Sequence, residues 1–274
     1  MPNIDTTALS QELLSAYNSG AMIATPPSAR DPPFGMNAAY EVEAEFTRLR
    51  KAAGRTVTGL KVGYASKAMW RLLKLETLVW AHMYDDTVHY ANGTLAELTL
   101  PPHRSPKIEP EIVFKLREPI GTAGLDAEAV LRYIEWLAVA FEIIDCPFPD
   151  WQFKPVDFVA AFGLHRCLVV GEALQFEPEM IPTLAENLTN FKVKVSKDGQ
   201  FVEEGSGKNS LRSPALCLAE LAGAVLRHPG ATPLTTGYLV STGTLTAGHP
   251  IARGEIWQVE VDGLPVSNLT LSLT

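Results

Sequence analysis

Cysteine is scarce in this sequence: 274 residues include only Cys146, Cys167 and Cys217, which stand far apart. An odd, scattered set makes a poor disulfide framework and lacks the spacing of zinc ligands. We therefore expect three reduced, mostly buried thiols of the kind usual in a cytoplasmic protein, and no cysteine nucleophile.

Long apolar runs and an excess of basic residues are also missing. No apolar run reaches the roughly 18 residues of a transmembrane helix. The opening residues MPNIDTT lack a basic segment followed by an apolar stretch, so we expect no secretory signal and a cytoplasmic location. Lys and Arg total 23 against 31 Asp and Glu, a net charge of −8. This balance disfavours nucleic acid or an anionic membrane as a partner, and an anionic substrate would need a local device to overcome the negative field.

The hydrophobic content, 46%, is that of a globular protein with an ample core. Residues 6–18, capped by Asp5, and residues 37–53, ended by Gly54, have the periodicity of amphipathic helices. Between them, residues 24–35 hold four prolines, which predicts a loop. That loop is either a lid over a substrate or a static connector.

After residue 54 short strands dominate. We expect strands at 56–64 and 110–117, a strand pair at 156–171 bent at Gly163, hairpins at 191–204 and 255–273, and helices at 66–73, 126–138 and 213–228. This order predicts an α+β fold with a mostly antiparallel or mixed sheet. We place a helical N-terminal cap at 1–54, not an independent unit, on a β-rich catalytic body at 55–274.

Three carboxylates suggest chemistry. Glu109 and Glu111 are two residues apart in a predicted strand and so share a face. Glu142 stands alone in the apolar run 138–144, where a carboxylate is costly unless it is paired or bound to a metal. Three oxygen ligands suit Mg²⁺ or Mn²⁺ better than zinc. The alternatives are a solvated edge-strand face for the pair and an arginine partner for Glu142.

Lysines and a second acidic pair add to this set. Lys61 lies between Gly59 and Gly63, where a ligand can approach the backbone closely, and its ammonium can hold a carboxylate or move a proton. Lys67 follows in the next helix. Asp86 is the more favourable of two adjacent aspartates for facing a site. Snorkelling surface lysines and a turn aspartate are the structural alternatives.

Small polar residues at 241–246 can present hydroxyl and backbone N–H groups to an anion, or they form a plain loop. His165 faces either the core or the site. The sequence contains no nucleophile elbow, P-loop or dinucleotide fingerprint.

Taken together, these motifs resemble the fumarylacetoacetase-like superfamily, and within it the 2-keto-4-pentenoate hydratase and 4-oxalocrotonate decarboxylase group. The segments that carry the resemblance occur in the family's order and are 39–42 (AYEV), 59–69 (GLKVGYASKAM), 83–86 (MYDD), 108–114 (IEPEIVF), 140–145 (AFEIID) and 241–244 (STGT).

The resemblance implies a fumarylacetoacetase-like mixed β-roll and a divalent cation held by Glu109, Glu111 and Glu142. The cation would bind the 1-carboxylate and 2-oxo oxygens of a short oxo acid and stabilise an enolate. Lys61 matches the family's catalytic lysine, and Asp86 matches an acid that relays a proton. We assign substrate contacts to a further five residues: Lys67, Phe162, His165, Thr242 and Thr244.

The sequence departs from the group at one place. Residues 156–160 (VDFVA) match, but residues 161–165 read AFGLH where hydratases carry polar residues. Ala161 and Phe162 would form an apolar wall, which favours a hydrophobic substrate tail or a different outcome of the enolate chemistry.

The leading hypothesis is a metal-dependent lyase that hydrates a 2-hydroxy-2,4-dienoate, or its 2-oxo tautomer, to a 4-hydroxy-2-oxo acid. The first alternative is a hydrolase of carbon–carbon bonds in acylpyruvates or 1,3-diketones, and the second is a decarboxylase of a vinylogous 2-oxo acid. A binding protein that kept the fold and lost activity is the non-enzymatic alternative. By analogy we expect a homo-oligomer, with association with a pathway enzyme as a further prediction.

Overall fold

The computed structural model describes residues 4–274. Residues 1–3, part of the segment in which we expect no secretory signal, lie outside that range. Among the described residues, none of the helices has both the length and the apolar content to cross a bilayer. All three cysteines are free and buried, as predicted.

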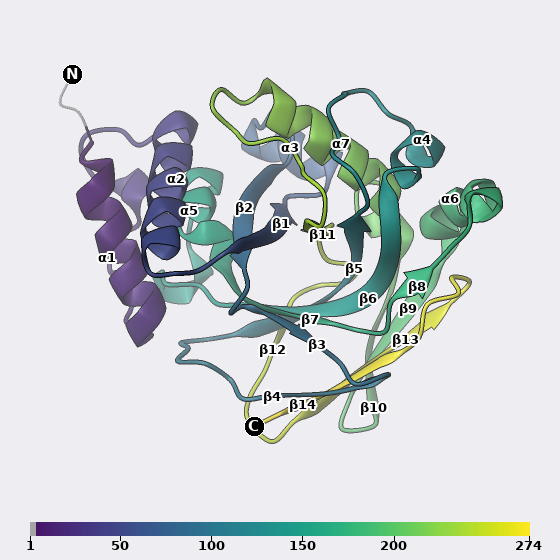
Figure 1. Ribbon diagram of the computed structural model, residues 1–274. Helices are drawn as coiled ribbons and strands as arrows, with labels where there is room; N and C mark the ends of the chain where they lie inside the picture. The colour runs from purple at the N-terminus through teal and green to yellow at the C-terminus, as the bar shows by residue number, and fades with distance from the viewer. Residues whose placement is uncertain (1–3) are drawn as a thin grey trace.

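Seven α-helices occur in the described range. They are α1 (Thr6–Ser19), α2 (Met36–Ala52), α3 (Lys67–Leu73), α4 (Ala127–Leu131), α5 (Pro155–Ala160), α6 (Ile181–Asn190) and α7 (Pro214–Arg227). Short 3₁₀ turns stand at Pro27–Ala29, Pro149–Trp151, Phe162–Leu164, Pro178–Met180 and Gly207–Asn209. In Figure 1, α1, α2 and α5 gather on one side of the molecule, and α4 and α6 lie on the opposite side.

The strands form two sheets. The larger contains β1 (Val57–Gly63), β2 (Val79–Tyr84), β3 (Val88–Tyr90), β5 (Lys107–Leu116), β6 (Ile134–Ile144), β7 (His165–Val170), β8 (Leu174–Gln175), β11 (Leu239–Ser241) and β12 (His249–Pro250). The smaller contains β4 (Leu95–Leu98), β9 (Lys192–Lys197), β10 (Gln200–Ser206), β13 (Ile256–Asp262) and β14 (Leu269–Leu273). The predicted mixed α+β class is confirmed, because β1 pairs parallel with β11 while β5 and β6 pair antiparallel.

The larger sheet is curled, with the main path β2-β1-β11-β5-β6-β7-β3 (Figure 1). The long strands β5 and β6 stand near its middle, and they supply the fully buried Phe114 and Phe141. Strands buried on both faces carry near-continuous apolar runs, which accounts for the run at 138–144. A carboxylate in such a strand is therefore surrounded by protein rather than water.

Polar contacts cap α1 and join α2 to the body. Asp5 caps α1 by accepting from the Ala8 N–H, as predicted. Glu43 of α2 accepts a hydrogen bond from the His82 N–H of β2. The proline-rich segment 24–35 is tied down as well, because the Ser28 N–H and hydroxyl donate to Asp157 at 2.7 and 2.6 Å. A cap boundary at residue 54 stays a prediction.

Two predicted elements are wrong. The helix expected at 126–138 is only the short α4, and the chain from Ile134 onward is β6. Pairing with β5 along the whole of β6 outweighs the local helical periodicity. The strand pair expected at 156–171 is α5, a 3₁₀ turn and then β7. Pro155 at the first helical position and Asp157, which accepts from the Lys154 N–H, begin a helix there.

Other expectations hold. The hairpin at 191–204 turns at Asp198 and Gly199, and the C-terminal hairpin pairs β13 with β14. The helix begun by Ser213 and Pro214 runs to Arg227.

Candidate metal centre and active site

The register of β5 and β6 brings three glutamates together. Glu109 lies directly opposite Glu142 in this antiparallel pair. Glu111 is two residues further along β5 and so shares the face of Glu109. Side chains opposite or diagonal on one sheet face are within reach of each other. The sheet therefore brings Glu142 to a pair of glutamates that lie 31 and 33 residues earlier in the sequence.

This cluster fits a hard divalent cation. One carboxylate oxygen from each glutamate lies within 4.8 Å of the others. Glu111 and Glu142 are fully buried, and Glu111 Oε1 has no hydrogen-bond partner. An orphaned buried carboxylate oxygen beside two further carboxylates is unfavourable without a cation. Oxygen ligands of this kind are those that Mg²⁺ and Ca²⁺ prefer.

The other oxygen of Glu111 is held by the segment after β11. The Ser241 hydroxyl donates to Glu111 Oε2 at 2.5 Å, and the Gly243 N–H donates to the same oxygen at 2.9 Å. Residues 241–246 were predicted to present hydroxyl and N–H groups to an anion. In the structure, the anion that Ser241 and Gly243 contact is the carboxylate of Glu111. Sequence reasoning did not identify Ser241 and Gly243 as the groups that orient Glu111.

Glu142 lies between the Lys61 ammonium and the His165 imidazole. Lys61 Nζ lies 3.0 Å from Glu142 Oε2, and His165 Nδ1 lies 2.7 Å from Glu142 Oε1. His165 Nε2 in turn lies 3.0 Å from the Thr87 hydroxyl. Partners of this kind fix the orientation of a metal-ligating carboxylate. His165 thus contacts a predicted ligand, whereas we expected it to contact substrate.

Burial and like charge set the electrostatics of the cluster. Burial raises the pKa of Glu109 to about 7 and the pKa of Glu111 well above its usual range. Burial acts in the same direction on Glu142, but attraction to Lys61 and the His165 hydrogen bond outweigh it and hold the Glu142 pKa below its ordinary value. Without a cation, protons are therefore shared unevenly over the three carboxyls.

Lys61 is a buried ammonium at the edge of the cluster. Its Nζ donates to the Gly163 carbonyl at 2.9 Å. Burial opposes the charge, but Glu142, Glu109 and Glu111 outweigh it and raise the Lys61 pKa. Gly163 has a φ of +65°, and a Cβ there would lie 2.6 Å from Lys61 Cδ. The absence of a side chain at Gly163 therefore leaves the space that the lysine fills.

A cavity of about 320 Å³ opens onto these groups. Lys61, Glu109, Glu111 and Thr244 are the predicted site residues that line it. Its remaining lining is mostly apolar and aromatic. A cavity of this volume suits a small organic acid.

Asp86 is not brought to this cavity. It pairs with Arg50 and, at 3.2 Å, with Arg55, and it lines a separate cavity that also contains Arg166. Asp86 lies in the turn between β2 and β3, as in the turn-aspartate alternative, and Arg50 and Arg55 attract its carboxylate there. The structure thus places the expected proton relay away from Lys61.

Four residues expected to contact substrate are also placed elsewhere. Phe162 stacks on Phe46 in the core beneath the N-terminal helices. Thr242 is fully buried and donates to the Ile112 carbonyl. Lys67 is exposed on α3, and His165 lies behind Glu142. The expected apolar wall of Ala161 and Phe162 therefore faces the core, because residues 155–160 form a helix and not a strand.

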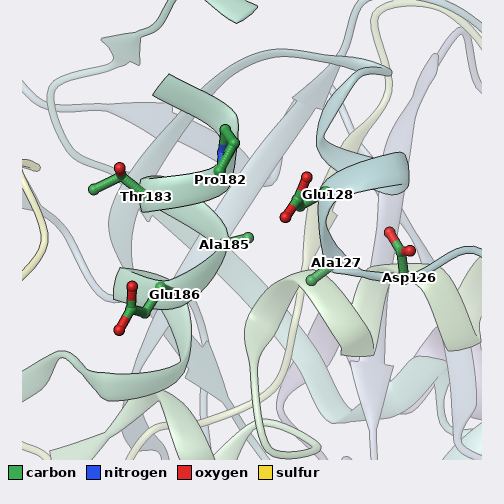
Figure 2. A pocket seen from close by; sticks show the side chains of 7 residues that line it. All are labelled: Asp126, Ala127, Glu128, Pro182, Thr183, Ala185 and Glu186. Carbon is green, nitrogen blue, oxygen red and sulfur yellow. The ribbon is translucent and has the colours of Figure 1, made fainter. Parts of the chain in front are cut away.

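A second, larger cavity of about 590 Å³ lies between α4 and α6 (Figure 2). Its walls include Asp126, Glu128 and Glu186. Within residues 4–274, the grouping of carboxylates close enough to share an ion is the one at Glu109, Glu111 and Glu142. The cavity at that cluster is therefore the candidate active site.

The curated relatives of this chain include hydratases and decarboxylases. A 2-hydroxyhexa-2,4-dienoate hydratase from Comamonas testosteroni is 28% identical over 256 residues, covering 93% of this chain and 92% of the relative. A 4-oxalocrotonate decarboxylase from a Pseudomonas species is 29% identical over 266 residues, covering 97% of each.

Solved structures support the fold. A 4-oxalocrotonate decarboxylase from Pseudomonas putida G7, complexed with magnesium and adipate, matches with a TM-score of 0.85 and 24% identity over 98% of this chain and 97% of that one. This likeness confirms the predicted fumarylacetoacetase-like fold. Residues 63–271 match the family model described as fumarylacetoacetate (FAA) hydrolase C-terminal. The chain belongs to that family.

Proposed function

We propose that this chain is a lyase that depends on a divalent cation and hydrates a 2-hydroxy-2,4-dienoate, or its 2-oxo tautomer, to a 4-hydroxy-2-oxo acid. The observation that carries the proposal is the convergence of Glu109, Glu111 and Glu142 beside Lys61 at the end of a small cavity. The hydratase relatives, which align over nearly the whole chain, favour this reaction.

Glu109, Glu111 and Glu142 would hold the cation, with Mg²⁺ as the first choice and Mn²⁺ as the alternative. When bound, the cation supplies Lewis-acid stabilisation of negative charge on an α-oxo acid. The protein contributes the orientation of its ligands. Ser241 and Gly243 fix Glu111, and His165 fixes Glu142.

Lys61 is the candidate catalytic residue. Its raised pKa keeps it an ammonium at neutral pH, so it acts as a hydrogen-bond donor and an acid, not as a base. It lines the cavity next to the carboxylates. In that position Nζ can donate to an oxygen that gains negative charge during the reaction, and can deliver or recover a proton. Asp86 is dropped from this scheme because it lies in an arginine cluster elsewhere.

The reaction balances as an isomerisation followed by addition of one water. The 2-hydroxyl proton is lost and C5 gains a proton, which leaves a 2-oxo group and a C3–C4 double bond. Water then adds, with its hydroxyl on C4 and its proton on C3. The Lys61 ammonium is suited to both steps because each builds up charge on the C2 oxygen.

Loss of dienoate absorbance tests the proposal. The purified protein is incubated with 2-hydroxypenta-2,4-dienoate in Mg²⁺ and, separately, in EDTA. We expect turnover in Mg²⁺, little in EDTA, and recovery when Mg²⁺ is restored. A product heavier by one water identifies hydration, whereas two acids would identify carbon–carbon hydrolysis. Absence of cation-dependent turnover across several chain lengths would contradict the proposal.

Decarboxylation is the second candidate. It is favoured by the 0.85 TM-score match and by the relatives named 4-oxalocrotonate decarboxylase. Release of CO₂ from 4-oxalocrotonate in the same assay format would identify it. The test therefore separates the two reactions that the same site could carry out.

We further propose a cytoplasmic enzyme that forms homo-oligomers. The three free, buried thiols suit a reducing compartment. Association with a pathway enzyme stays a prediction by analogy, and light scattering of the purified protein measures the oligomeric state.

A further inference from the structure

An aromatic wall leads outward from the predicted reaction centre. It starts at Phe158, whose ring centroid lies 5.1 Å from Lys61 Nζ. Tyr64 contacts Phe158 with ring centroids 5.3 Å apart, and Phe153 follows at 6.4 Å from Phe158. Trp151 continues the series at 6.4 Å from Phe153. These four rings all line the cavity, so a connected series of aromatic side chains begins beside Lys61 and forms part of the cavity's lining.

Aliphatic side chains complete the cavity surface. Met69, Ile144 and Leu164 line it together with the rings. The Trp151 indole is fixed in place because its N–H donates to the Ser105 hydroxyl at 2.8 Å. A rigid apolar surface of this kind favours an apolar ligand and offers little to a charged one.

The lining of the cavity contains few cationic side chains. Among the residues that line the cavity, Lys61 is the one cation, and it is paired with Glu142 and bonded to the Gly163 carbonyl. Lys107 is close by, with its ammonium 3.9 Å from the Trp151 ring centroid, but it does not line the cavity.

Besides Lys61 and the two glutamates, four polar side chains line the cavity, and two of them, Thr244 and Asn209, already donate hydrogen bonds within the protein. The Thr244 hydroxyl donates to the Thr246 carbonyl, and the Asn209 amide donates to the Leu245 carbonyl. Ser66 is the other hydroxyl side chain on the wall besides Thr244 and Tyr64. A second carboxylate on the substrate would therefore lose its hydration without gaining a cationic partner.

We infer that this site, if the proposed function holds, selects substrates with one carboxylate and an uncharged, apolar tail. The single carboxylate is the one next to the 2-oxo group, and the tail, an alkyl or aryl group, lies along the wall formed by Tyr64, Phe158, Phe153 and Trp151. Dicarboxylates of the same length are disfavoured. This assignment deepens the proposed function by naming its substrate class.

Binding of unreactive 2-oxo acids tests the inference. Calorimetry on the Mg²⁺-loaded protein compares 2-oxohexanoate with 2-oxoadipate, which has the same six carbons and a terminal carboxylate. Pyruvate, which has the shared 2-oxo acid group and almost no tail, reports on the reaction centre alone. We expect 2-oxohexanoate to bind at least about tenfold more tightly than 2-oxoadipate, because burying an unpaired carboxylate costs more than the roughly 1.4 kcal/mol of a tenfold difference.

Two outcomes overturn the inference in distinguishable ways. If pyruvate binds but 2-oxoadipate equals or exceeds 2-oxohexanoate, the tail assignment is wrong while the proposed reaction centre stands. If none of the three acids binds in Mg²⁺, the proposed function fails, and the tail assignment fails with it.

A matched pair of variants sharpens the test. Met69 lines the cavity and is 37% exposed, whereas Leu72 lies on the same helix α3, is 73% exposed and does not line it. Met69→Arg places a cation at the cavity, so we expect the preference for 2-oxohexanoate to fall by at least about fivefold. Leu72→Arg adds the same charge outside the cavity and leaves the preference unchanged. Equal effects of both variants would show that general electrostatics, not the wall, sets the selectivity.

Discussion

Replacing Glu109 by glutamine should reverse its effect on stability between the metal-free and the metal-loaded protein. Glu109 is held beside Glu142 by strand register, and burial raises its pKa to about 7. A carboxyl group whose folded pKa lies above the unfolded value of 4.5 binds more protons in the native state. Stability of the metal-free protein therefore falls as pH rises from about 4.5 to about 7.

The size of the effect follows from this difference. At about 1.4 kcal/mol per pKa unit, the interval from 4.5 to about 7 corresponds to a loss of roughly 3 kcal/mol at pH 8. Glu109→Gln removes the ionisation, so the metal-free variant should be more stable than the parent at pH 8 by up to about 3 kcal/mol. At about 2–4 °C per kcal/mol, that is a gain of up to about 6–12 °C in Tm.

With Mg²⁺ the order should invert. A cation at about 1,000 times its Kd stabilises the parent by roughly 4.1 kcal/mol, which exceeds the gain of up to about 3 kcal/mol in the metal-free variant, and a variant with one ligand charge fewer loses nearly all of the stabilisation by the cation. Thermal melting at pH 5 and pH 8, in EDTA and in Mg²⁺, measures all four values. Glu41→Gln, which changes an exposed residue of α2, is the matched control and should shift none of them.

The reasoning is refuted if Glu109→Gln destabilises the protein in EDTA at pH 8, since the carboxylate would then be favourable in its own right. It is also refuted if Mg²⁺ raises the Tm of parent and variant equally. The first result would remove the electrostatic argument, and the second would place the cation elsewhere.

Three further predictions concern the surroundings of the cluster. His165→Leu should weaken Mg²⁺ binding about 10–100-fold, because Glu142 would lose the hydrogen bond that orients it. His165→Gln should restore part of the Mg²⁺ affinity through a new hydrogen bond to Glu142. Calorimetry measures both affinities, and an equal loss in the two variants would contradict an orienting role. Lys61→Met should reduce turnover at least about 100-fold yet tighten Mg²⁺ binding, because it removes a competing cation; parallel loss of both would indicate general damage to the site. Asp157→Ala should lower the free energy of unfolding, measured in urea, by about 3 kcal/mol. The reason is that the Ser28 N–H, the Ser28 hydroxyl and the Lys154 N–H would lose their acceptor. An unchanged unfolding midpoint would show that this contact does not hold segment 24–35 in place.

Local sequence signals identified most elements with a distinct start or stop. The α1 cap at Asp5 and the turn at Asp198 and Gly199 are encoded within a few residues. Signals failed where pairing partners are distant. Residues 134–138 have mixed periodicity, and their pairing with β5 and β8 makes them a strand. The helix at 155–160 is a different case, because its signal is local: Pro155 and Asp157 fix its first turn, and the strand prediction there overlooked them.

The sequence by itself determined which residue types were available: two glutamates two apart in a strand, a third in an apolar run, and a lysine between glycines. It also sufficed to recognise the family. Only the tertiary structure decided which of these groups meet. Register between β5 and β6 sets Glu109 opposite Glu142, whereas Asp86 and Phe162 turn toward arginines and the core. The physical reason is that spacing along one strand fixes the face on which a side chain lies, but the neighbours on that face come from strands and loops far away in sequence.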